Sequence, residues 1–263
     1  MQQKPLLLLI FIGLTCFSFG SAAGQKRQPN PVIEAKITEL LSKMTLDEKM
    51  GQLNQYTSRW EMTGPAPQGN SEQQMLDMIK NGMVGSILNV TGAEATRNAQ
   101  KLAVENSRLK IPMIFGYDVI HGYQTMFPIP LAEAASWELE LARKTARVAA
   151  VETAASGIQW TFAPMVDIAR DARWGRFMEG SGEDPYLGSL FAAARVKGFQ
   201  GEDLSASNTI AACVKHFAAY GFAEAGRDYN TVDISESTLR NVVLPPFKAA
   251  ADAGALTFMN AFN

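Results

Sequence analysis

The sequence predicts an α/β protein with a parallel sheet, because short apolar segments alternate with amphipathic segments along most of the chain. The apolar runs predict strands at residues 84–89, 112–117, 158–163, 210–216 and 256–259. Apolar residues at helical spacing predict helices at residues 93–108, 136–157, 186–199 and 235–253. We expect Ser136 to cap the second of these helices and the last one to break near Pro245-Pro246. Strands this uniformly apolar are typical of a sheet that helices cover on both faces.

Helical segments also precede the first predicted strand. Residues 32–44 have the spacing of an amphipathic helix, and Thr45 with Glu48 forms a capping box for the next one. Residues 71–80 predict a third helix, which ends at Asn81-Gly82.

The first 23 residues resemble a secretory signal. Lys4 precedes an apolar run over residues 6–19, and small residues follow at 21–23. A spanning helix needs about 20 apolar residues, so this run is too short to cross a membrane. A lipoprotein signal at Cys16 is the alternative, although Thr15 fits poorly before it. We therefore expect a mature chain of residues 24–263, exported to the periplasm or the medium, with no membrane span.

Composition restricts the ligands. Lys and Arg number 24 against 26 Asp and Glu, which gives no reason to expect nucleic acid or an anionic membrane as a partner. Removal of the signal leaves Cys213 alone, so no disulfide can form within the chain. One Cys and two His cannot build a Cys/His-rich zinc site, and we expect neither a metal nor a cofactor.

The predicted strand count leaves two architectures open. A closed (β/α)8 barrel of the TIM type needs eight strands, whereas an open doubly wound sheet can have five. Asp118, Asp167, Lys215 and His216 all lie at or just past the carboxyl end of a predicted strand. Both architectures bind ligands there, but no Gly-rich phosphate loop follows any strand, which weakens the nucleotide-binding interpretation.

Two short motifs at strand ends have chemistry suited to a sugar. In the segment 117–122, the Asp118 carboxylate can accept two hydrogen bonds from neighbouring hydroxyl groups. A helix cap or an ion pair at the barrel rim is the alternative, and His121 is expected to be structural. In the segment 214–217, Lys215 and His216 supply two adjacent donors that suit hydroxyl oxygens. A buried lysine paired with a carboxylate is the alternative there.

The loop at residues 170–184 is the third motif. Seven of its fifteen residues are charged, with both signs interleaved, which predicts a network of ion pairs that braces the loop. A loop of this length after a barrel strand usually contributes to the site, so we expect at least one arginine to reach the pocket. Trp174 and Phe177 are candidates to stack on a sugar, with core packing as the alternative.

These motifs, taken in order, resemble glycoside hydrolase family 3, in its β-glucosidase-type branch. The matching stretches are residues 117–122, 163–176, 183–186 and 215–217, and the similarity runs from about Val32 to Asn263. The resemblance implies a TIM-type barrel of which about five of eight strands are present. It also implies that the sugar in subsite −1 is held by Asp118, Arg170, Lys215 and His216.

One branch of the family cleaves N-acetylglucosamine residues and follows its Lys-His pair with a Pro-Gly-containing loop that carries a catalytic His. Here residues 218–221 read Ala-Ala-Tyr-Gly, and the chain has no third His. This departure favours a glucosidase or a xylosidase.

The resemblance implies hydrolysis of terminal non-reducing β-D-glucosyl residues, from a β-linked oligosaccharide or glucoside, by a retaining mechanism. That mechanism uses two carboxyl groups, and both are expected beyond Asn263. Asp167 lies next to the Arg-rich loop and is expected in an ion pair. We therefore expect residues 24–263 to be a truncated N-terminal portion of the catalytic domain, inactive alone. The alternatives are a β-xylosidase, a β-glucan exohydrolase or a non-catalytic sugar-binding protein.

Overall fold

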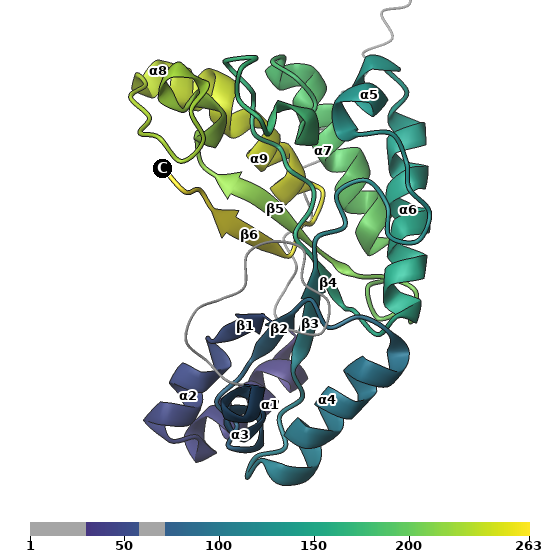
Figure 1. Ribbon diagram of the computed structural model, residues 1–263, viewed down its shortest axis with the longest axis vertical. Helices are drawn as coiled ribbons and strands as arrows, with labels where there is room; N and C mark the ends of the chain where they lie inside the picture. The colour runs from purple at the N-terminus through teal and green to yellow at the C-terminus, as the bar shows by residue number, and fades with distance from the viewer. Residues whose placement is uncertain (1–29, 58–71) are drawn as a thin grey trace, which may run out of the picture.

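The computed structural model describes residues 30–57 and 72–263 (Figure 1). Within these residues, six parallel strands form one sheet in the order β1-β2-β3-β4-β5-β6. The strands are β1 (Gln55–Thr57), β2 (Ser86–Leu88), β3 (Ile114–Tyr117), β4 (Trp160–Thr161), β5 (Ala211–Phe217) and β6 (Thr257–Asn260). The sheet curls into part of a barrel with helices along its outer side, which confirms the incomplete (β/α)8 prediction.

Two helices precede the first strand, and the others lie between successive strands. The helices are α1 (Pro31–Lys43), α2 (Leu46–Gln52), α3 (Glu72–Lys80), α4 (Ala93–Asn106), α5 (Pro130–Ala135), α6 (Leu139–Ala155), α7 (Pro185–Gln200), α8 (Glu236–Thr238) and α9 (Leu244–Asp252). Local sequence explains several of their starts. The predicted capping box of Thr45 and Glu48 opens α2. The side chain of Asp184 caps α7 by accepting a hydrogen bond from the Leu187 backbone N–H, with Pro185 in the first turn.

Three expectations about elements need correction. Strand β1 was not predicted, since three residues without an apolar run give no strand signal. Ser136 lies at the end of the short helix α5, and α6 begins only after Glu138. Pro245 and Pro246 do not break a helix, because a π-helical turn over Leu239–Val243 precedes them and they occupy the first turn of α9, where a missing N–H costs nothing. The proposed signal peptide lies outside the described residues.

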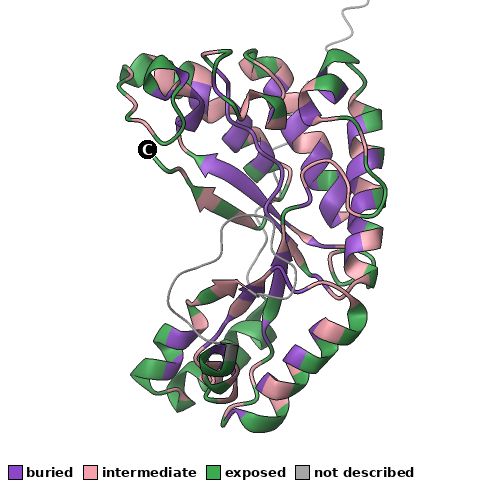
Figure 2. Cartoon of the chain, viewed as in Figure 1, coloured by how far each residue is buried: buried purple, intermediate pink, exposed green. Residues whose placement is uncertain are grey.

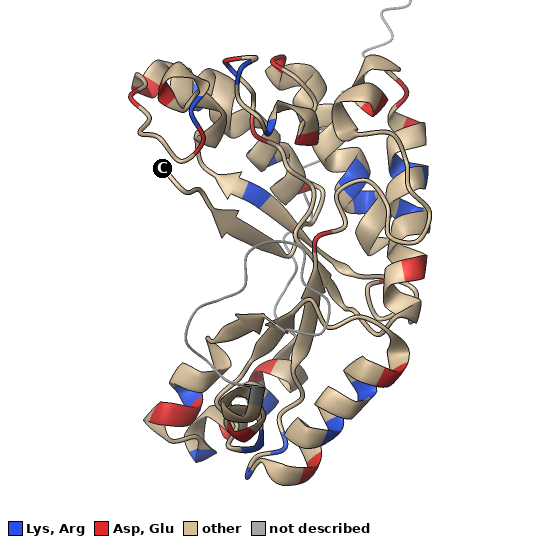
Figure 3. Cartoon of the chain, viewed as in Figure 1, with Lys and Arg blue, Asp and Glu red and all other residues tan. Residues whose placement is uncertain are grey.

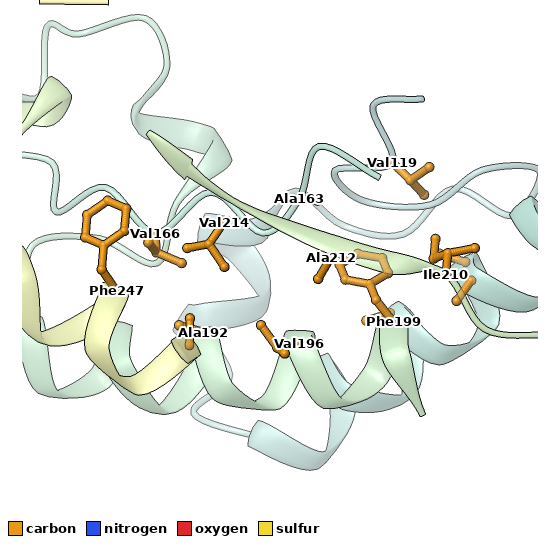
Figure 4. Packing of buried hydrophobic residues seen from close by; sticks show 14 of the residues in the cluster. Val119, Ala163, Val166, Ala192, Val196, Phe199, Ile210, Ala212, Val214 and Phe247 are labelled. Atoms are coloured by element: carbon orange, nitrogen blue, oxygen red, sulfur yellow. The ribbon is translucent and has the colours of Figure 1, made fainter. Parts of the chain in front are cut away.

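The main core fills the space between the sheet and the helices α6, α7 and α9. Figure 4 shows side chains from strand β5 facing side chains from α7 and α9. Val214, Ala212 and Ile210 face Val196, Phe199 and Phe247, and all six are almost completely buried. Burial of this apolar surface is the principal stabilising contribution to the fold.

Burial varies across the sheet. Strand β5 is buried along most of its length, whereas β6 at one edge and β1 at the other are partly exposed (Figure 2). Charged residues occur mostly in the outer helices and the loops, and the strands are almost free of them (Figure 3). Lys215 is the exception in β5. A charged residue in the most buried strand requires a specific partner.

Candidate functional site

Lys215 lies near the carboxyl end of β5 and Asp118 directly follows β3. The Lys215 Nζ donates a hydrogen bond to Asp118 Oδ1 at 2.8 Å. The lysine side chain is only 5% exposed, whereas the aspartate side chain is 52% exposed. The pair therefore joins a buried cation to a carboxylate that solvent or a ligand can still reach. The ion pair considered from the sequence is formed, and among the described residues the second oxygen of Asp118 has no side-chain partner.

His216 follows Lys215 and is completely buried. Its Nδ1 lies 2.7 Å from Asp167 Oδ2, and its backbone N–H donates to the same oxygen at 3.0 Å. Asp167 reaches this position because the chain after β4 continues beside β5, with the Val166 N–H donating to the Lys215 carbonyl at 2.8 Å. Asp167 was expected to be held in an ion pair, and its partner is His216 rather than an arginine of the neighbouring loop.

The charged loop is braced as predicted, by ion pairs within it. Arg173 pairs with Asp171 at 2.5 Å, and Arg176 pairs with Glu179 at 2.7 Å. Burial opposes ionisation of Glu179, but the hydrogen bond and charge of Arg176, with smaller contributions from Lys215 and His216, hold its pKa below the ordinary value. Glu179 therefore adds negative charge close to the Lys-His pair.

Aromatic rings pack around His216. Tyr220 and Phe262 place their ring centroids 5.2 and 5.3 Å from the imidazole. Trp174 is buried against Tyr220 and donates its indole N–H to Asp228 at 2.9 Å. Core packing is therefore the role of Trp174. Phe262 is half exposed, and it extends the aromatic surface from His216 towards solvent.

Arg170 is separate from the other predicted site residues. Its side chain is exposed, and no ion pair or side-chain hydrogen bond joins it to another residue in the described part of the chain. It lines a hollow of about 450 Å³ together with Glu183, Asp184 and Phe222. The structure thus brings Asp118, Lys215 and His216 together, whereas the guanidinium of Arg170 has no side-chain partner within the described ranges.

The other candidate groups have structural partners. His121 Nδ1 contacts the Phe127 carbonyl oxygen at 2.9 Å, in agreement with a structural role. Cys213 is buried, and burial raises the pKa of its thiol. Residues 30–57 and 72–263 contain no cluster of His, Cys, Asp and Glu that suits a metal ion. No helix in those ranges is long and apolar enough to cross a membrane.

The sequence model of the glycosyl hydrolase family 3 N-terminal domain matches residues 45–263. The chain belongs to this family. It is 46% identical over 230 residues to the periplasmic β-glucosidase of Salmonella typhimurium, covering 88% of this chain and 29% of that protein. It is 32% identical over 269 residues to a β-xylosidase of Formosa agariphila, covering 95% of this chain and 31% of that protein.

Solved structures of family 3 agree with the fold. The β-glucosidase of Listeria innocua in complex with isofagomine superposes with a TM-score of 0.79 at 44% identity. The match covers 88% of this chain and 32% of the Listeria chain. The chain thus spans about a third of the length of the relatives that it matches.

Sequence reasoning did not identify two contributors to the site. Asp167 was placed at a strand end and expected in an ion pair, but His216 was not identified as its partner. Glu179 was counted among the bracing charges of the loop. Its proximity to Lys215 depends on how the loop folds back over β5, which no local pattern encodes.

Proposed function

We propose that this chain holds the terminal non-reducing glucosyl residue of a β-glucoside in subsite −1 of a retaining β-glucosidase of family 3. The observation that carries the proposal is the convergence of Asp118, Lys215 and His216 at the carboxyl ends of β3 and β5. Ligands of parallel α/β barrels bind at that end. Arg170, which has no ion-pair partner within the described residues, is proposed as the fourth sugar-binding residue.

The chemistry of these groups suits sugar hydroxyls. The Asp118 carboxylate has an oxygen that is not bonded to Lys215 and can accept hydrogen bonds, and charged acceptors form strong ones. Lys215 supplies donors beside it. A ligand that excludes water but lacks matching hydroxyls would leave the remaining hydrogen-bonding positions of these groups unused, at a cost of about 1–3 kcal/mol for each group.

The cleavage step is proposed to need residues beyond Asn263. A retaining glycosidase uses two carboxyl groups about 5–5.5 Å apart, one as nucleophile and one as acid/base. The carboxylates at this site are each held by a cation or by an imidazole, as Asp118 is by Lys215, Asp167 by His216 and Glu179 by Arg176. Residues 24–263 alone are therefore expected to bind a sugar without hydrolysing a glucoside.

A β-xylosidase is the second candidate, because the relative from Formosa agariphila carries that name. Glucose and xylose differ by the hydroxymethyl group at C5, so their relative affinities separate the two candidates. A β-glucan exohydrolase would share the glucosyl subsite. A non-catalytic sugar-binding protein would bind glucose as well as a glucosidase does. It would differ in that a protein as long as the relatives would not hydrolyse glucosides.

Export to the periplasm or the medium is part of the proposal. The signal-like residues 1–23 and the periplasmic name of the Salmonella relative support it.

Calorimetric titration with glucose, xylose and isofagomine tests the proposal. We expect glucose and isofagomine to bind, with xylose weaker. Lys215→Met should weaken glucose binding at least about tenfold, because a charged hydrogen bond contributes about 1.5–3 kcal/mol. Lys43→Met is the matched control, since Lys43 forms an exposed ion pair on α1. Unchanged glucose affinity in Lys215→Met, or tighter binding of xylose than of glucose, would contradict the glucosyl assignment.

A further inference from the structure

The contact between Asp167 and His216 is more specific than an ordinary ion pair. One carboxylate oxygen, Oδ2, accepts two hydrogen bonds from the same residue, from the backbone N–H at 3.0 Å and from Nδ1 at 2.7 Å. The two side chains are 1% and 0% exposed. The hydrogen bond from the backbone N–H fixes the position of the His216 backbone, and the hydrogen bond from Nδ1 fixes the direction of the ring.

This arrangement determines where the imidazole carries its proton. A carboxylate oxygen only accepts hydrogen bonds, and the backbone N–H already identifies Oδ2 as an acceptor. Nδ1 must therefore be the protonated nitrogen when the ring is neutral. Nε2 then carries a lone pair, as in other sites where a carboxylate sets the tautomer of a histidine.

Nε2 has no hydrogen-bond partner among the residues that the structure describes, although it is buried. The nearest rings, Tyr220 and Phe262, pack edgewise or tilted against the imidazole. An unsatisfied buried acceptor destabilises the fold, so a group that donates to Nε2 would recover free energy on binding. A sugar hydroxyl is such a group, and Lys215 already places the sugar site beside His216.

We propose that Asp167 is a positioning residue of the sugar site. It holds the proton of His216 on Nδ1 and keeps Nε2 as an acceptor for a sugar hydroxyl. The use of Nε2 by a sugar rests on the function proposed above, whereas the tautomer does not. Two adjacent residues of β5 then bind the sugar differently, since Lys215 donates a hydrogen bond and His216 accepts one. Because a hydroxyl both donates and accepts, each of the two residues can bind a hydroxyl group of the sugar.

The tautomer can be measured directly because the chain has only two histidines. In 15N-labelled protein, a long-range 1H–15N spectrum at a pH where the rings are neutral separates protonated from bare nitrogens. We expect His216 to show a protonated Nδ1 and a bare Nε2. A His121→Asn variant assigns the signals. A wild-type His216 with its proton on Nε2 would overturn the proposal, whatever the variants do.

Two variants separate positioning from simple packing. Asp167→Ala removes the acceptor, so His216 should shift to the Nε2-protonated form and glucose affinity should fall about tenfold. Asp167→Asn retains an oxygen facing the His216 N–H, so the tautomer and most of the affinity should be preserved. Asp171→Ala, which removes the partner of the exposed Arg173, is the control and should leave His216 unchanged. A purely structural aspartate would leave the tautomer unaffected in folded Asp167→Ala, and that result would refute the positioning role.

Glucose addition completes the test. The His216 Nε2 resonance of the wild type should move, and the His121 resonances should not. If calorimetry shows that glucose does not bind at all, the proposed function fails, while the sugar-free spectra still decide whether Asp167 sets the tautomer. If glucose binds without moving Nε2, the positioning role towards the sugar is refuted.

Discussion

The pair of Lys215 and Asp118 predicts an asymmetric response to removal of either partner. The lysine side chain is 5% exposed and the aspartate side chain 52%. Asp118→Ala would leave an ammonium group in a buried strand without the carboxylate that hydrogen-bonds to it. Lys215→Met would leave a carboxylate that water can still solvate, and would place an apolar side chain in an apolar strand. The first change should therefore destabilise the fold more than the second.

The magnitudes follow from the exposures. Removing one partner of a fully buried pair costs about 3–5 kcal/mol. The half-exposed Asp118 position admits some water to the lysine, so we expect about 2 kcal/mol for Asp118→Ala. Exposed ion pairs contribute about 0–1 kcal/mol, and Lys215→Met should fall in that range. In a Lys215→Met background, Asp118→Ala should cost less than about 0.5 kcal/mol, which a double-mutant cycle measures.

Urea unfolding at neutral pH is the assay, with an exposed pair as the control. Glu39 and Lys43 on α1 are 67% and 56% exposed at 2.6 Å, so Glu39→Ala and Lys43→Met should each change the free energy of unfolding by less than about 0.5 kcal/mol. Equal costs for Asp118→Ala and Lys215→Met would show that burial does not set the energetics of this pair. An undiminished cost of Asp118→Ala in the Lys215→Met background would show that the two side chains are not coupled.

Two further predictions concern regions away from the site. Gly198→Ala should destabilise the fold by about 1–3 kcal/mol in urea unfolding, because its Cβ would lie 2.5 Å from a backbone oxygen of α6. Gly175→Ala, with no atom within 4 Å of the new Cβ, is the control and should be close to neutral. The hydrogen bond from Arg108 lowers the pKa of Glu48 from its ordinary value of about 4.5 to about 2. The contribution of the Arg108–Glu48 pair to stability is therefore present above the ordinary pKa and is lost as the pH falls through about 2. Arg108→Gln should therefore lower the urea midpoint at neutral pH, and a difference that persists undiminished at acid pH would contradict the assignment.

The sequence predicted most of the fold because hydrophobic periodicity reports burial. The runs that became β2 to β6 are apolar since helices cover them. Strand β1 was not predicted because it is short and partly exposed, and such a strand does not require a run of apolar residues. Ser136 was a reasonable cap by type, but it ends α5, and the choice between ending one helix and starting the next depends on how the chain turns there.

The sequence predicted those site residues whose position follows from lying at the end of a strand. Asp118, Lys215 and His216 were identified by their place after apolar runs, and parallel strands bring such positions to one edge. The partner of Asp167 was not predictable, because several cations adjoin it in sequence and only the continued pairing beside β5 selects His216. Local patterns place a residue at the edge of a sheet, whereas partner choice depends on the packing of separate segments.

A crystal structure with isofagomine bound is the most direct test of the central claim, that this chain forms the glucosyl-binding subsite. The account predicts that hydroxyl groups of the ligand lie within hydrogen-bond distance of the Asp118 carboxylate, the Lys215 Nζ and the His216 Nε2. A ligand bound away from the carboxyl ends of β3 and β5, or one that leaves all three groups without a contact, would contradict it.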